Sequence, residues 1–241
     1  MKKIISLFIL VTFSSVFVSA QSDKRNVIKF YPASPFFGKT TLGYERVIDE
    51  KKSITFNIGL PTGVSIQSYL SSNISEGLDV HTGRLKGFLI MPGYRANLSK
   101  KAAPVGFYVE PYLKYEKFTM NLGGEFIDKE QERFDSDING TYSGYGAGFQ
   151  IGAQWLALDI ISFDISFGPE AKIGTMDVLW ADKSGEVNIG DVYNDLDDSF
   201  AKTPIIGGKM ELTKGADYVK VRIPRQFIPG LRVAFSLGIA F

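Results

Sequence analysis

Three oxygen-bearing side chains stand at alternate positions in the second half of the chain. Asp135, Asp137 and Asn139 are followed by Gly140, which gives the pattern D-x-D-x-N-G. This spacing matches the start of a calcium-binding loop, where alternate oxygens converge on the ion and the glycine makes a sharp turn. The twelfth position of such a loop supplies a bidentate glutamate, but here it is Gly146. The pattern predicts either an incomplete external calcium site or a plain Asp/Asn/Gly turn.

The sequence contains few of the residue types that usually catalyse reactions. The chain has no cysteine and one histidine, His81, which excludes thiolate nucleophiles, thiolate zinc sites and two-histidine metal motifs. A lipid-modifying enzyme of the envelope needs a histidine with a nucleophilic serine and an orienting acid, whereas Thr82 and Gly83 follow His81. We therefore predict no catalytic residue, no cofactor and a non-enzymatic protein.

The charge balance argues against nucleic acid as a partner. The chain carries 27 Lys and Arg against 26 Asp and Glu, a formal net charge of +1. A nucleic-acid-binding protein usually shows a basic field. We expect no nucleic-acid partner.

Residues 1–20 have the pattern of a secretory signal peptide. Lys2 and Lys3 precede an apolar stretch from Ile4 to Phe13, and small residues lead to Ala20. The polar residues that follow suggest cleavage there, so we expect the mature domain to cover residues 21–241. The apolar stretch is short for a retained membrane helix.

Alternation of apolar with small or polar residues dominates the rest of the chain. In the clearest example, Leu231 to Phe241, every second residue is apolar. Successive strand side chains point to opposite faces, so each such stretch predicts a strand with one continuous apolar face. Eight stretches follow the pattern: 27–32, 40–48, 53–60, 88–94, 105–116, 144–155, 161–168 and 231–241.

Three features favour a membrane barrel over a soluble one. The polar rows are rich in glycine and serine, which suits a narrow interior. Short connections alternate with long ones, as in outer-membrane barrels; the short ones are 49–52, 98–104 and 156–160, and the long ones are 62–83, 119–140 and 175–227. The final apolar row of Leu237, Ile239 and Phe241 is similar to the signal read by barrel assembly machinery.

We therefore predict an all-β fold: an eight-stranded antiparallel transmembrane β-barrel with long external loops, located in the outer membrane. Eight strands leave an interior that side chains can fill. Charges of both signs on the polar rows predict ion pairs that plug it. The candidates are Glu45, Arg95, Glu110, Lys114, Glu116, Asp164, Glu170, Lys172 and Arg232.

The long final connection is the strongest candidate for contact with a partner. It carries aromatic residues among many charges, a composition suited to recognition. Residues 190–202 predict a short helix with Asp191 near its N-terminus. The alternation in 218–223 indicates instead that strands extend beyond the membrane.

A set of short motifs near the N-terminus and in the middle of the chain resembles a Gram-negative family of small outer-membrane β-barrels of unknown function. The matching residues are Asn26 to Phe30, Pro32, Phe37-Gly38, Leu42 to Arg46, Gly106 to Tyr108, and Pro111-Tyr112. The resemblance implies the fold and the location, in an architecture similar to the OmpA-like and OmpX-like barrels. It implies no activity.

These observations predict a structural or surface-interaction role. The expected partners are outer-membrane lipid, the barrel assembly machinery, and an external ligand or envelope protein bound through 119–140 and 175–227. The alternatives are a small-solute or ion pore, and an exported soluble barrel that binds a hydrophobic ligand.

Overall fold

The computed structural model describes residues 24–66, 78–127, 133–185, 187–201 and 210–241. The predicted signal peptide, residues 1–20, lies outside these ranges. The strands are β1 (Asn26–Tyr31), β2 (Lys39–Asp49), β3 (Lys52–Pro61), β4 (Val64–Ser65), β5 (Leu78–Asn97), β6 (Gly106–Ile127), β7 (Arg133–Ala157), β8 (Ile161–Asp182), β9 (Glu211–Lys214) and β10 (Tyr218–Ala240). A 3-10 helix, η1, spans Ser34–Phe37, and an α-helix, α3, spans Ile189–Ala201.

Eight of these strands form a closed antiparallel ring. The order is β1-β2-β3-β5-β6-β7-β8-β10, and β10 pairs again with β1. The closing register runs from Val27 opposite Ala240 to Phe30 opposite Leu237. The prediction of an all-β fold with eight antiparallel strands is thereby confirmed.

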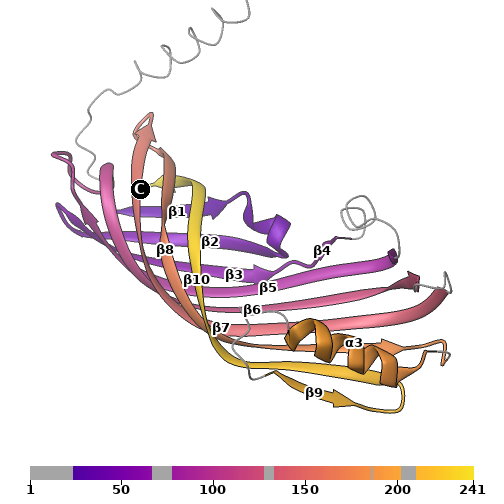
Figure 1. Ribbon diagram of the computed structural model, residues 1–241. Coiled ribbons are helices and arrows are strands. Elements are labelled where there is room, and N and C mark those ends of the chain that lie inside the picture. The colour runs from indigo at the N-terminus through magenta and orange to yellow at the C-terminus, as the bar shows by residue number, and fades with distance from the viewer. Residues whose placement is uncertain (1–23, 67–77, 128–132, 186, 202–209) are drawn as a thin grey trace, which may run out of the picture.

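The strands differ greatly in length. β1, β2 and β3 have 6, 11 and 10 residues, whereas β5, β6, β7, β8 and β10 have 20 to 25. The long strands therefore continue past the ring as one curved sheet, with α3 and β9 near its far edge (Figure 1). We call the end with the tight connections the turn end, and the end with α3 the helix end.

The flanking strands extend far into two of the long loops predicted from the sequence. Residues 119–127 belong to β6 and residues 133–140 to β7, and the register between them is continuous. Likewise β8 runs to Asp182, and β10 begins at Tyr218. The prediction ended each strand where its apolar row ended, but the strands continue with the apolar row on the opposite face.

The predicted helix at 190–202 is confirmed as α3, shifted by one residue at each end. It contacts β9 and β10. Within the described ranges, no helix is long and apolar enough to cross a membrane.

Side chains fill the interior of the ring near the turn end, and most of them are polar. Glu45, Ser53, Glu110, Gln154 and Ser162 are each at most 1% exposed. Leu89, Met91 and Tyr112 form a small apolar cluster farther along the interior. The outer face is the reverse: Phe107, Tyr145 and Val233 are about 70% exposed, at 69%, 70% and 71%.

Candidate functional site

Glycines on β7 make room for the large side chains of the interior. The ring of Tyr108 lies across Gly152 from the neighbouring strand, and the ring of Tyr112 lies across Gly148 in the same way. A Cβ atom at Gly152 would also lie 2.6 Å from the carbonyl oxygen of Ile165. Gly148 and Gly152 thus provide the space that two tyrosine rings of β6 occupy.

Five charged side chains near the turn end form what we call the turn-side cluster: Lys29, Glu45, Arg95, Glu110 and Asp164. Lys29 Nζ lies 2.7 Å from both Glu45 Oε2 and Asp164 Oδ2. Arg95 Nη2 lies 2.7 Å from Glu110 Oε2 and 3.0 Å from Asp164 Oδ2. Every member is at least 95% buried.

Neutral side chains of neighbouring strands form hydrogen bonds with this cluster. Tyr108 donates a 2.5 Å hydrogen bond to Asp164, and its ring lies 3.6 Å from the Arg95 guanidinium. Thr55 donates to Glu110 at 2.6 Å, and Gln154 accepts from Lys29 and Arg95. Charges are rarely buried unless they are paired and hydrogen-bonded. Side chains from seven strands therefore meet in this cluster inside the ring.

A second group, the helix-side cluster, lies farther along the interior and comprises Lys114, Glu116, Glu170 and Lys172. Lys114 Nζ is 2.6 Å from Glu170 Oε2 and 3.3 Å from Glu116 Oε2. Lys172 Nζ is 3.1 Å from Glu116 and 3.3 Å from Glu170. The four side chains form a closed square of alternating charge with no net charge.

Two further cations lie beside this square. Lys39 Nζ sits 4.6 Å from the ring centre of Phe118, and Lys39 interacts electrostatically with Glu116, Lys114, Arg232 and Lys172. Arg232 donates to Gln150 at 3.1 Å and lies over the ring of Tyr112 at 5.7 Å. Within the described ranges, neither forms a salt bridge, so this part of the interior carries two positive charges beyond its carboxylates.

The polarity of both faces reverses toward the helix end. Near the turn end, β6, β7 and β8 point apolar side chains outward and polar ones inward; beyond the helix-side cluster they do the opposite. Inward-facing register rows there are Phe118–Tyr142–Met176–Ile223, Met120–Gly140–Val178–Val221 and Leu122–Ile138–Trp180–Val219. Outward-facing residues at the same levels include Lys117, Asn121, Asn139, Asp177 and Arg222.

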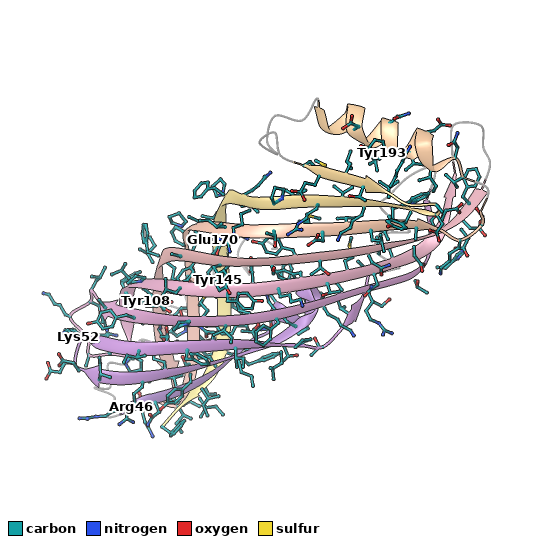
Figure 2. All side chains as sticks on the ribbon, turned by 90° about the horizontal axis from the view of Figure 1, so that it is seen from below. Arg46, Lys52, Tyr108, Tyr145, Glu170 and Tyr193 are labelled. Carbon is teal, nitrogen blue, oxygen red and sulfur yellow. The ribbon has the colours of Figure 1, made fainter. Side chains whose placement is uncertain are left out.

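Helix α3 covers part of this apolar inner face. It contacts β9 and β10, and Val219 and Val221 of β10 are buried, as is Ile189 at the N-terminus of the helix. Tyr193 of α3 lies beside Lys214 of β9, 5.6 Å from ring centre to Nζ. Figure 2 shows Tyr193 near the helix end, with Arg46 and Lys52 at the turn end. The part of the face on β6 and β7 has no helix packed on it within the described ranges.

The calcium-loop residues do not form a loop. Asp135, Asp137 and Asn139 lie in the extended strand β7 and face outward. Alternate residues of a strand are about 6.6 Å apart, whereas oxygens that share one calcium ion each lie about 2.4 Å from it. Asp137 instead pairs with Lys183 at 2.7 Å. The residues therefore lie in a strand, not in the loop or turn that the pattern predicts.

His81 lies in β5 rather than in a loop. Its Nε2 is 3.6 Å from Glu125 Oε1, and its side chain is 54% exposed. No group of three or more His, Asp or Glu suited to a metal occurs among the described residues.

Asp182 ends β8 and organises the turn that leads to α3. Its carboxylate accepts hydrogen bonds from the side chain and backbone of Ser184 and from the backbone N–H of Val187. Burial acts to raise the pKa of Asp182, but these hydrogen bonds outweigh it, so the pKa lies below its usual value.

The sequence-predicted interior charges gather in two places. Eight of them form the two clusters, and Arg232 lies between the clusters and beside Lys39. Leu237 and Ile239 of the proposed assembly signal lie on the outer face of β10, opposite Phe30 and Ile28. Phe241 is 53% exposed.

Sequence reasoning missed Lys29, Lys39 and Tyr108. Lys29 falls in the weakly alternating stretch 27–32, and Lys39 lies just before the stretch 40–48. Tyr108 lies on the same row as the predicted interior charges Glu110 and Lys114. The position of Lys29 between Val27 and Tyr31, on the row opposite to Ile28 and Phe30, was the signal that could have placed it inside. Comparisons with protein families, with curated proteins and with solved structures found no match.

Proposed function

We propose that this chain is an outer-membrane β-barrel with a structural or surface-interaction role. In this proposal the ring spans the membrane, its interior is plugged by ion pairs, and the extended sheet stands outside the cell. The observation that carries it is the reversal of polarity along single strands, which an all-soluble or an all-embedded sheet would not need.

The dimensions of the apolar band agree with this proposal. On β8 the outward residues are apolar or proline from Ile161 to Ile173. At about 3.3 Å per residue this band is about 40 Å long, and a tilt of about 45° reduces its height to about 28 Å. The hydrocarbon core of a bilayer is about 30 Å thick. Beyond Ile173 the outward residues include Thr175 and Asp177, which suit water.

The turn-side cluster supports a sealed interior rather than a pore. Its five charges join β1, β2, β5, β6 and β8 through contacts of 2.7 to 3.2 Å. An ion that passed through would have to separate buried pairs, which is costly. We expect no steady conductance from the purified protein in planar bilayers; an ohmic channel would favour the pore.

The same proposal gives the outward row of Leu237, Ile239 and Phe241 a role in recognition by the barrel assembly machinery. Phe241→Lys is then expected to slow assembly-factor-dependent insertion into vesicles, whereas Lys100→Glu, in an exposed turn, is not. Equal insertion rates for the two variants would remove that role.

The two tryptophans offer a direct test of the membrane position. Trp155 lies on the outer face, stacked on Phe163 with ring centres 5.8 Å apart. Trp180 lies on the inner face near the helix end. Trp180→Phe and Trp155→Phe leave one reporter each. In vesicles containing brominated phospholipid we expect strong quenching of Trp155 and little of Trp180.

Two results would overturn the proposal. One is equal or reversed quenching of the two tryptophans. The other is a monodisperse protein that stays in solution without detergent, which would favour the exported soluble barrel. Heat-modifiable gel migration provides the check that each single-tryptophan variant is folded.

A further inference from the structure

The charges of the interior are unequally balanced along its axis. The turn-side cluster has two cations and three carboxylates, and each cation contacts at least two carboxylates. In and beside the helix-side cluster there are four cations and two carboxylates: Lys114 and Lys172 pair with Glu116 and Glu170, whereas Lys39 and Arg232 form no salt bridge within the described ranges. The excess of two positive charges lies at the level where the interior opens onto the extended sheet.

Lys39 is the least satisfied of these cations. Its ammonium group lies over the ring of Phe118, a weak partner compared with a carboxylate. Its stem runs past Gly59 and Gly87, each of which would place a Cβ atom 3.1 to 3.2 Å from Lys39 Cδ. Two glycines on different strands thus leave the space that this stem fills while it reaches inward.

An apolar surface begins directly above these charges. Phe118, which lies under the Lys39 ammonium group, stands in the register row that continues through Tyr142 to Met176. The rings of Phe118 and Tyr142 lie 6.5 Å apart, and Met176 is 38% exposed. We call six inward-facing apolar residues of β6, β7 and β8 the apolar wall: Phe118, Met120, Leu122, Ile138, Tyr142 and Met176.

We propose that the helix-side end of the interior binds an anionic amphiphile, an acyl chain that carries a carboxylate or a phosphate. The headgroup lies among Lys39, Arg232 and Lys172, where it balances the excess positive charge. The chain lies along the apolar wall. This inference deepens the proposed function and takes from it only that the helix end faces outward from the membrane.

The charged headgroup and the acyl chain of the ligand each satisfy a different part of the site. A free anion would satisfy the cations but leave the wall in water, and a neutral alkane would cover the wall but leave Lys39 without a counter-charge. Burial of apolar area contributes about 25 cal/mol per Å², and a charge-assisted hydrogen bond is roughly twice as strong as a neutral one. The amphiphile therefore binds more tightly than either half.

The test uses the folded full chain in dodecyl maltoside micelles, a detergent with the same chain length as the probe and a neutral headgroup. In the Trp155→Phe variant, Trp180 stands in the register row of Leu122 and Ile138 and reports on the wall. Dodecyl phosphate is the probe, and inorganic phosphate and dodecanol represent its two halves. We expect a saturable fluorescence change with dodecyl phosphate, at least about tenfold tighter than with either half.

Matched variants locate the site. Lys39→Gln and Arg232→Gln are each expected to weaken dodecyl phosphate binding about tenfold, and Lys39→Arg is expected to restore it. Met176→Gln is expected to weaken the alkyl phosphate without changing phosphate binding. Lys100→Gln, at the turn end, removes the same charge and is expected to change nothing.

The outcomes separate this inference from the proposed function. A protein that inserts and shows heat-modifiable migration but binds no dodecyl phosphate overturns the site and leaves the membrane barrel. A protein that binds it while remaining soluble without detergent overturns the barrel and supports the site. Equal binding to wild type and Lys39→Gln, or a dimer that buries the wall and excludes the probe, also overturns the site.

Discussion

The turn-end half and the helix-end half of the long strands share backbone and register but use opposite faces. Near the turn end, β7 points Tyr145, Phe149 and Ile151 outward and glycines inward; toward the helix end it points Asn139 outward and Ile138 inward. Both halves belong to the same strands, so each face is continuous from one half to the other. What changes along each strand is which face carries the apolar side chains, and under the proposed function the level of this reversal is the boundary between the membrane and water.

The halves also differ in how fully their inner faces are occupied. In the turn-end half, a Cβ atom at Gly152 would meet Tyr108 and the backbone at Ile165, whereas at Gly140 the nearest atom would be Met120 Cε at 3.7 Å. In the first half the opposite wall of a closed ring faces the sheet, and in the second it does not. The interior is thus tightly packed around Gly152 and more open around Gly140.

Removal of Arg95 should produce the largest effect. Arg95→Met leaves Glu45, Glu110 and Asp164 buried with Lys29 as the only cation. Breaking a buried ion pair by removing one partner costs about 3–5 kcal/mol. We expect a loss of that size in the free energy of unfolding, measured with urea in lipid vesicles.

The control is Arg46→Met, on the exposed outer side near the same end. Arg46 donates one hydrogen bond to Asn26 at 2.7 Å. Its replacement should cost about 1 kcal/mol or less. If the two variants lose the same stability, the turn-side cluster is not what closes the interior.

A cation on the outer face tests the reversal itself. Phe149 and Thr141 both lie on the outer face of β7, the first within the apolar band and the second beyond it. Phe149→Arg should destabilise the protein in vesicles by about 2–4 kcal/mol, because an arginine near the bilayer midplane is costly. Thr141→Arg, beside Asp177 in the register, should change stability by less than about 0.5 kcal/mol.

A soluble protein would give a different contrast. Phe149→Arg would then replace a side chain already 48% exposed to water and would be tolerated about as well as Thr141→Arg. Similar stability of the two variants would therefore count against a membrane at this level.

Much of the turn-end half could be predicted from the sequence because alternation is strong there. The row from Leu231 to Ile239 identifies a strand and its apolar face without any tertiary information, and mixed charges on the opposite rows indicate interior pairing. What alternation cannot give is which charges meet. Lys29 and Asp164 are 135 positions apart in the sequence. Lys29 Nζ and Asp164 Oδ2 lie 2.7 Å apart because β1 and β8 both pair with β10 in the closed ring.

The helix-end half was harder to predict for a physical reason. From residue 117 to 125 the outward residues are polar or glycine, and they separate inward apolar residues such as Met120 and Leu122. In the preceding stretch the apolar residues occupy odd-numbered positions, and that apolar row ends at residue 117. The strand persists because its neighbours pair with it, which is a tertiary cause, and only the 218–223 stretch signals this in the sequence.

Replacement of glycine by alanine compares the packing density of the interior in the two halves. Gly152→Ala should destabilise the protein by about 1–3 kcal/mol, because the added methyl group meets the Ile165 carbonyl oxygen at 2.6 Å. Gly140→Ala, on the same strand and face, meets only Met120 at ordinary contact distance. It should be neutral or stabilising by up to about 1 kcal/mol. Urea unfolding of both variants gives the measurement; a destabilised Gly140→Ala would mean that the helix-end interior is as tightly filled as the rest.

The smallest expected effect is local and lies at the helix end. Asp182→Asn keeps one acceptor oxygen but cannot accept from both Ser184 and Val187, whose N–H groups use different carboxylate oxygens. We expect faster amide exchange at Val187 with little change in global stability. Asp177→Asn, on the outer face of the same strand, should leave that amide unchanged, and equal exchange in both variants would mean that the Asp182 carboxylate does not order the turn.

The pH dependence of this turn follows from the lowered pKa of Asp182. A carboxyl whose pKa is lower in the folded state than the usual value of about 3.9 stabilises the fold above that value. This contribution is lost as the pH falls through the folded-state pKa. Protection of the Val187 amide should thus be constant from pH 7 to about pH 4 and decline below it, after correction for the intrinsic exchange rate. In Asp182→Asn the decline should vanish. If it persists, another group titrates and contacts other than the Asp182 carboxylate hold the turn.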